Sequence, residues 1–187
     1  MTYRGALTMM HGMLFGAFFL LASYAMLLEL LRLWHPYSAT PMSARGRRFE
    51  NIYLAVTAAL GWLAVFSGTY VVYPWYRAVP AAGADLHDYP RSLLLASSAT
   101  ASLHTIGMEW KEHVAFIAPI AFTALAWICY RYPNEVRRHP VVRRTLFAFG
   151  LAALLSAAIP GVTGALLNKA APTEDPRTNT SVRAEVR

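Results

Sequence analysis

The chain has 187 residues, of which 56% are apolar and only 14% are charged, and its formal net charge is +7. A soluble domain usually carries about 25% charged residues. A single cysteine, Cys129, excludes a disulfide scaffold and a cysteine-based zinc or iron–sulfur site. The apolar content excludes a disordered chain. The basic residues flank long apolar runs, which argues against a nucleic-acid-binding protein. The composition therefore indicates an integral membrane protein.

Four stretches reach the length of about 20 mostly apolar residues that a membrane-crossing helix needs. They cover about residues 7–34, 52–73, 113–130 and 145–167. None alternates with period two, and backbone groups in lipid must be bonded internally, so all four are predicted to be helices. The first lacks a basic cluster before it and an A-x-A site after it, which favours an uncleaved helix over a signal peptide. The predicted fold is all-α: a four-transmembrane-helix bundle within a single domain, residues 1–170.

The segments outside these spans are more polar. Residues 74–112 form a predicted outer loop, punctuated by proline and glycine at its start. Within it, Arg91–Trp110 is too polar to cross a membrane and is expected to form a surface helix that leads into the third span. Residues 171–187 form a polar tail rich in Thr, Arg and Glu, which predicts disorder.

The basic residues predict the orientation. The connections between spans one and two and between spans three and four, with their flanks, hold nine basic and three acidic residues, a net charge of +6. The opposite side holds eight basic and seven acidic residues, a net charge of +1. Because cytoplasmic loops carry the excess of Lys and Arg, both termini and the long outer loop are predicted to be outside, on the periplasmic or extracytoplasmic side of an inner (plasma) membrane.

Histidines are costly in lipid unless they have partners or a function. Of the six, His35, His87 and His139 lie in polar loops and are expected to be solvated. The other three, namely His11, His104 and His113, converge on the outer half of the bundle. His104 and His113 are nine residues apart, about 900° around a helix, so they do not share a face if the segment is one helix.

Two imidazoles at equal depth on different helices can ligate a haem, and a bundle core is a usual place for such a site. His11 and His113 are the predicted axial pair, with His104 as the substitute for either. Small residues that leave room for a porphyrin gather at the same depth: Gly12, Gly16, Gly68, Gly161 and Gly164. Close packing of helices is the alternative explanation for these glycines.

With four spans and with His11 and His113 at bundle ends, residues 7–167 resemble small b-type membrane cytochromes built on a four-helix bundle. The resemblance implies one haem b near the outer face. It does not extend to the two-haem pattern of such proteins, because the inner leaflet holds no second histidine pair.

Copper is a second candidate ligand for the same region. Met9, Met10 and Met13 surround His11, and thioether and imidazole ligands suit Cu(I). In the run Glu109–His113, Glu109 and His113 are i,i+4 neighbours, so this carboxylate can orient the imidazole or join a metal site. The alternative is a charged helix end at the interface, with Lys111 extending toward the headgroups.

Three functions stay open at this point. The first is a membrane electron-transfer subunit of a larger redox complex, with haem b and with quinol and other membrane subunits as partners. The second is a cofactor-free structural or assembly subunit, and the third is a copper-handling membrane protein. The chain has no hydrolytic or transferase motif, so any enzymatic role is at most quinol-linked electron transfer.

Overall fold

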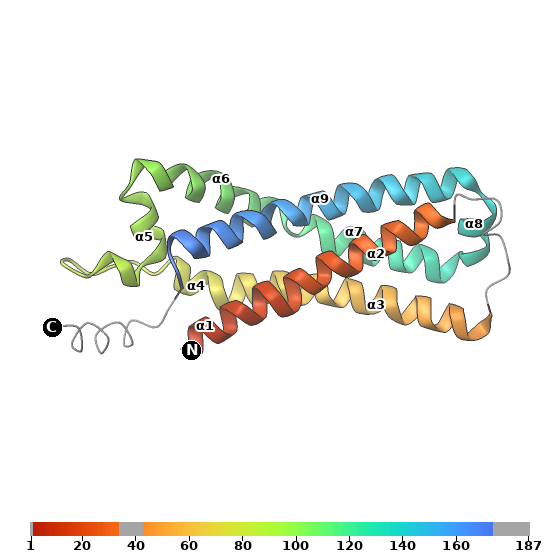
Figure 1. The fold of residues 1–187 in the computed structure, drawn as a ribbon, viewed down its shortest axis with the longest axis horizontal. Coiled ribbons are helices and arrows are strands. Elements are labelled where there is room, and N and C mark those ends of the chain that lie inside the picture. The colour runs from red at the N-terminus through yellow and green to blue at the C-terminus, as the bar shows by residue number, and fades with distance from the viewer. Residues whose placement is uncertain (1, 34–42, 174–187) are drawn as a thin grey trace.

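The computed structural model describes residues 2–33 and 43–173, and these are helical, with no strand among them. Four long helical segments are apolar enough to cross a membrane: Tyr3–Arg32, Ala44–Tyr76, Ser98–Arg131 and Pro140–Ala170. They run side by side along the long axis of the molecule (Figure 1). The predicted all-α four-helix membrane bundle is thereby confirmed. His35 and residues 174–187 of the tail lie outside the described residues.

The first two segments each contain a π-helical stretch. The first consists of α1 (Tyr3–Met9), the π-helix η1 (Met10–Ala17) and α2 (Phe18–Arg32). The second consists of α3 (Ala44–Ser67), the π-helix η3 (Gly68–Val72) and α4 (Tyr73–Tyr76). The two segments begin with hydroxyl caps, because Thr2 Oγ1 accepts from the amide of Gly5 at 3.0 Å and Ser43 Oγ from that of Gly46 at 3.1 Å.

The third segment starts earlier than the sequence pattern predicts. After the 3₁₀ turn η4 (Leu86–Asp88) and α5 (Pro90–Leu95), α6 (Ser98–Val114) leads into α7 (Ile117–Arg131). The helix breaks at Ala115 and Phe116 because Pro119 has no amide hydrogen to donate to the Ala115 carbonyl. Gly107 allows α6 to approach the fourth segment closely: a Cβ added at Gly107 would lie 3.2 Å from Cβ of Thr163. Much of residues 98–112 is therefore packed against the bundle.

The fourth segment follows a short connecting helix, α8 (Pro133–Arg138), and consists of α9 (Pro140–Ala170). Pro160 lies inside α9, so the carbonyl of Ser156 has no amide partner four residues later. The indole of Trp110 on α6 donates to this carbonyl, at 3.3 Å from Nε1 to O. A side chain of one helix thus satisfies the polar group that a proline exposes in its neighbour.

This contact makes the effects of two substitutions interdependent. Trp110→Phe is expected to destabilise the bundle by about 1 kcal/mol, because the Ser156 carbonyl loses its donor. In a Pro160→Ala background the same change should cost less, because the alanine amide now donates to Ser156. Thermal unfolding of the four proteins of this double-mutant cycle measures the difference. Equal losses in both backgrounds would contradict the assigned role of Trp110.

The buried side chains form two apolar clusters, one above the other along the bundle. The larger cluster fills the middle of the bundle and the half where α3 begins and α8 lies, here named the inner half, and is centred on Phe19, Phe122 and Leu125. The smaller one lies at the opposite end, here named the outer end, and contains Tyr76 and Leu94 with three further residues, Met108, Leu167 and Ala171. On α9, Ala153 belongs to the first cluster and Leu167 to the second. The layer between the clusters is where polar side chains enter the bundle.

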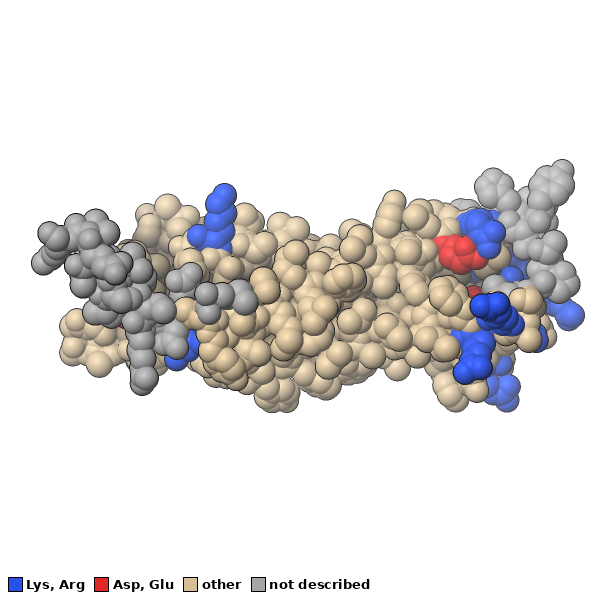
Figure 2. Space-filling model, turned by 60° about the horizontal axis from the view of Figure 1, so that its bottom comes forward, with Lys and Arg blue, Asp and Glu red and all other residues tan. Residues whose placement is uncertain are grey.

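On the face in Figure 2, charged side chains lie toward the two ends of the molecule and none lies in the middle, and exposed apolar side chains such as Leu21, Leu63 and Ile120 occur along the spans. At the end where α3 begins and α8 lies, Arg137 forms an ion pair with Glu50 at 3.3 Å. Arg143 is buried at this end, with 8% of its surface exposed, and donates to the carbonyls of Val136 and Arg137. These bonds hold the turn between α8 and α9 against the bundle. The apolar middle is what contact with a lipid bilayer requires.

Candidate functional site

His11 lies in the polar layer between the two apolar clusters, and its imidazole is held in one orientation. Its Nδ1 is 3.0 Å from Oγ of Ser67, and Ser67 Oγ donates to the carbonyl of Ala64 at 3.2 Å. Because the single hydroxyl hydrogen of Ser67 is used for that carbonyl, Ser67 accepts from His11, which assigns the proton of the neutral imidazole to Nδ1. Nε2 therefore carries a lone pair, and it has no hydrogen-bond partner among the described residues.

Both π-helical stretches meet at this histidine. His11 is the second residue of η1, and its ring lies on Gly68, the first residue of η3. A Cβ added at Gly68 would lie 2.7 Å from Cε1 of His11, so the ring occupies the space that any larger residue would need. π-Helical stretches make up well under 1% of residues and occur frequently at functional sites. Two of them packed around one imidazole make His11 the centre of the candidate site.

Lys111 extends into the same layer from α6. Its ammonium rests against Gly164 of α9, because a Cβ added at Gly164 would lie 2.9 Å from Nζ. Lys111 has no hydrogen bond or ion pair with any described residue. The sequence pattern favoured a lysine that extends toward the headgroups, whereas this ammonium lies against a neighbouring helix.

A hydrogen-bonded network covers the outer end of this layer. Arg77 donates to the Tyr73 hydroxyl at 2.6 Å, and this hydroxyl donates to the carboxylate of Glu112 at 2.7 Å. Beside it, the hydroxyl of Tyr76 is hydrogen-bonded to Nδ1 of His104. His104 is thus held by a residue of α4, and His11 by a residue of α3.

The structure does not bring the three candidate histidines together. His113 is 71% exposed at its side chain, and its Nδ1 is 2.9 Å from the carbonyl of Glu109 and 3.5 Å from the Glu109 carboxylate. Nine residues earlier, His104 faces Tyr76 inside the bundle, so the two lie on opposite faces of α6, as their spacing predicts. The partners of His11 and His104, Gly68 and Tyr76, are eight residues apart on one helical segment, which corresponds to about 12 Å in depth.

The side chains proposed for copper point away from the bundle. Met9, Met10 and Met13 are 51%, 36% and 64% exposed, so they lie on the outer surface of the first helix. Glu109 is also exposed and pairs with His113. In the part of the chain that the structure describes, no group of three or more His, Cys, Asp or Glu side chains is arranged to hold a metal ion.

Side chains of neighbouring helices occupy the space beside most glycines of the outer half. Gly68 accommodates His11, Gly161 contacts Leu20 at 3.3 Å and Gly164 accommodates Lys111. Gly12, by contrast, has no atom within 4 Å of the position of an added Cβ. Close packing thus accounts for Gly68, Gly161 and Gly164, and it is the packing that positions His11 and Lys111.

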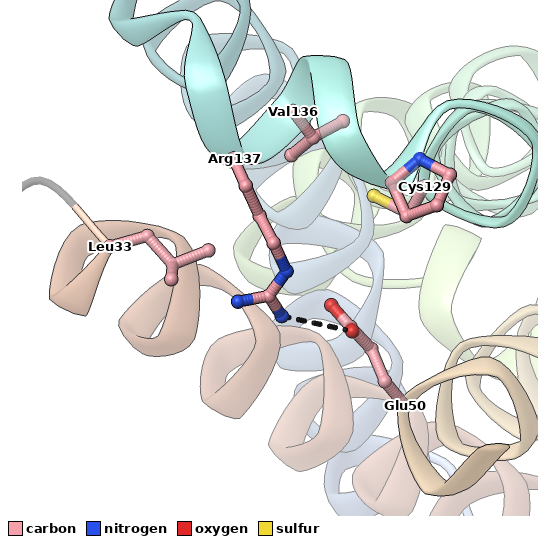
Figure 3. Close-up of a pocket in the computed structure, with 6 residues that line it drawn as sticks. Leu33, Glu50, Cys129, Val136 and Arg137 are labelled. Carbon is pink, nitrogen blue, oxygen red and sulfur yellow. Dashed lines mark hydrogen bonds and ion pairs between the residues drawn. The ribbon is translucent and has the colours of Figure 1, made fainter. Parts of the chain in front are cut away.

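A small cavity lies at the end of the bundle where α8 packs. It lies beside the ion pair of Glu50 and Arg137 and is lined as well by Cys129 (Figure 3). Its volume of about 10 Å³ is room for about one water molecule. Cys129 is 8% exposed and belongs to the larger apolar cluster. The cavity is therefore a packing gap beside an ion pair.

Ser67 and Lys111 were not expected as site residues, and Gly68 was expected to leave room for a porphyrin and not to accommodate the His11 ring. The signal for Ser67 is its place next to Gly68, but a Ser-Gly pair inside an apolar span is also common in ordinary helix packing. Lys111 was visible as a charge next to a span, but its direction depends on how α6 is rotated against α9. Comparisons with protein-family models, curated proteins and solved structures find no match to this chain, so its function is argued from this site alone.

Proposed function

We propose that the protein is a membrane electron-transfer subunit that holds one haem b in the outer half of the bundle, with His11 as an axial ligand. The observation that carries the proposal is the placement of the His11 imidazole: its Nδ1 is hydrogen-bonded to Ser67, and its Nε2 has no partner among the described residues. A ligating histidine commonly has its other ring nitrogen fixed in this way. Haem supplies one-electron chemistry, and the residues around it supply orientation and electrostatics.

Two further features support a ligand at His11. The hydroxyl of Thr8, one turn earlier on the same helix, is buried without a hydrogen-bond partner. Buried polar atoms are nearly always paired, so an unpaired hydroxyl three residues before His11 supports a further polar group in this part of the bundle. The nearby Lys111 ammonium disfavours a copper ion, because like charges repel strongly where water is excluded.

The arrangement supports one protein ligand to the iron and not two. His113 points outward to its own partner, Glu109, and His104 is bonded to Tyr76 at a different depth. Among the residues that the structure describes, His11 is therefore the one proposed to hold the haem. In the larger complex, membrane quinol is the proposed electron donor, and an acceptor on the outer side receives the electrons.

The function is tested by absorption spectra of the detergent-purified protein from haem-replete cells, oxidised and then reduced, with metal analysis of the same sample. We expect b-type bands in the wild type, their loss in His11→Ala, and no change in His139→Ala, the matched control. His139 lies at the inner end and pairs with Glu135 at 2.9 Å. A single axial histidine also predicts that the reduced protein binds carbon monoxide and that His113→Ala keeps its haem.

Each other outcome points to one of the competing functions. Full haem content in His11→Ala would overturn the assignment of the ligand. A colourless and iron-free wild type would make the cofactor-free structural or assembly subunit the leading function. Copper in the sample, lost on substitution of Met10 and Met13, would favour copper handling.

We further propose that both termini lie outside an inner (plasma) membrane, because the end formed by the start of α3 and by α8 carries the excess of Arg. A membrane-impermeant maleimide is expected to label Ala81→Cys in intact cells, and Ala44→Cys only after permeabilisation. Both positions are exposed, and Cys129 is buried, so the native thiol should contribute little signal. The reverse labelling pattern would invert the topology.

A further inference from the structure

We propose that Lys111 binds an anionic oxygen of an amphiphilic ligand in the outer half of the bundle. A lysine in a membrane-spanning helix is costly, and such residues usually pair with a counter-charge or serve a function. Lys111 has no counter-charge among the described residues, although Glu109 and Glu112 lie within two residues of it on the same helix.

The two neighbouring carboxylates have other partners. Glu112 accepts the hydroxyl of Tyr73, and Glu109 pairs with His113 on the exposed face of α6. Lys111 instead extends toward Gly164 on α9, where the absence of a side chain gives the ammonium its place. The Lys111 side chain therefore contacts α9 and neither carboxylate. Its ammonium has three hydrogen-bond donors, and none of them has an acceptor among the described residues.

The position of Lys111 indicates what kind of ligand it would meet. The layer is bounded by apolar clusters above and below, so a ligand there must be largely apolar. Within this layer, His11 offers a lone pair and Lys111 offers hydrogen-bond donors with a positive charge. An apolar body that carries an acidic group matches both the layer and the ammonium.

Two sources supply this chemistry. One is the carboxylate of a haem propionate, and this source rests on the proposed function. The other is the phosphate of an anionic phospholipid, which needs no haem. Charge-assisted hydrogen bonds of this kind are strong enough to change affinity by about tenfold to a hundredfold.

The experiment compares the full-length wild type with Lys111→Met and Lys111→Arg, and with Lys169→Met as the matched control. Lys169 is the other lysine of the chain and is exposed near the end of α9. Each protein is titrated with haemin and with haemin dimethyl ester, which lacks the carboxylates. Each is also assayed for retention of phosphatidylglycerol, with phosphatidylcholine as the neutral comparison.

A propionate partner predicts that the wild type binds haemin at least about tenfold more tightly than the ester. This preference should disappear in Lys111→Met and persist in Lys111→Arg and Lys169→Met. A phosphate partner predicts equal binding of haemin and ester, together with a loss of phosphatidylglycerol retention in Lys111→Met alone. Either result supports an anion site at Lys111 and identifies its source.

The proposal is overturned if Lys111→Met matches the wild type both in its haemin-to-ester preference and in its phosphatidylglycerol retention. Failure of the wild type to take up haemin would count against the proposed function, and the phospholipid assay would still decide the role of Lys111. Thermal unfolding without ligand checks the fold of each variant. We expect Lys111→Met to unfold at the same or a higher temperature, because it removes a half-buried charge that has no partner among the described residues.

Discussion

Gly68→Ala is expected to reduce haem binding by about tenfold to a hundredfold and to leave the four-helix fold in place. The added Cβ would lie 2.7 Å from Cε1 of His11, and 3.3 Å and 3.4 Å from its two nitrogens. Overpacking of this kind typically costs about 1–3 kcal/mol. If the His11 ring must return to its present position to bind haem, this cost is subtracted from the binding free energy and corresponds to the stated loss of affinity.

The His11 ring has little freedom to avoid the clash. Moving away from Gly68 breaks the hydrogen bond to Ser67, and this bond maintains the lone pair on Nε2. Haemin titration, followed by the absorption of the complex, measures the effect. Gly12→Ala is the matched control on the first helix, because no atom lies within 4 Å of its added Cβ. Unchanged haem affinity in Gly68→Ala would show that the ring position is not required.

Phe122→Ala is expected to give the largest loss of stability in the chain, about 3–5 kcal/mol. Phe122 is 2% exposed in the larger apolar cluster, and its ring meets that of Phe19 edge-on, with centroids 5.3 Å apart and planes at 84°. Phe19 in turn packs on Gly61, where an added Cβ would lie 2.9 Å from its ring. Removal of Phe122 therefore leaves a cavity where the first three long segments meet.

Unfolding in detergent by heat or denaturant measures this loss, and Ile120→Ala on the same helix is the control. Ile120 is 56% exposed on the apolar surface of the bundle, so its truncation removes few contacts inside the protein. We expect less than about 1 kcal/mol from it. Similar losses from the two substitutions would mean that Phe122 does not pack as described.

The spans were predictable from the sequence because their cause is local. Each of the four segments has enough consecutive apolar residues to cross a bilayer, and the structure contains four such helices. Their ends were less predictable. The third helix begins at Ser98 and not near residue 113, because Gly107 and Met108 give the polar segment one apolar face that packs on α9.

The candidate site was predictable only in part. His11 stood out as an imidazole within an apolar span, and the i,i+4 pair of Glu109 and His113 was expected from helix geometry and is present. Spacing along one helix could not reveal that His113 faces outward. Nor could it reveal that Ser67 and Gly68, on a different helix, position the His11 ring.

The sequence by itself determined the membrane class, the four helices and the relative faces of residues on one helix. Length, hydropathy and the 3.6-residue period are properties of a single segment, so they can be determined from its sequence without knowledge of the helices packed against it. Only the tertiary structure decided which face of each helix meets another. That rotation depends on close approach at glycines such as Gly68 and Gly164, and it turns His11 and Lys111 into the same layer of the bundle.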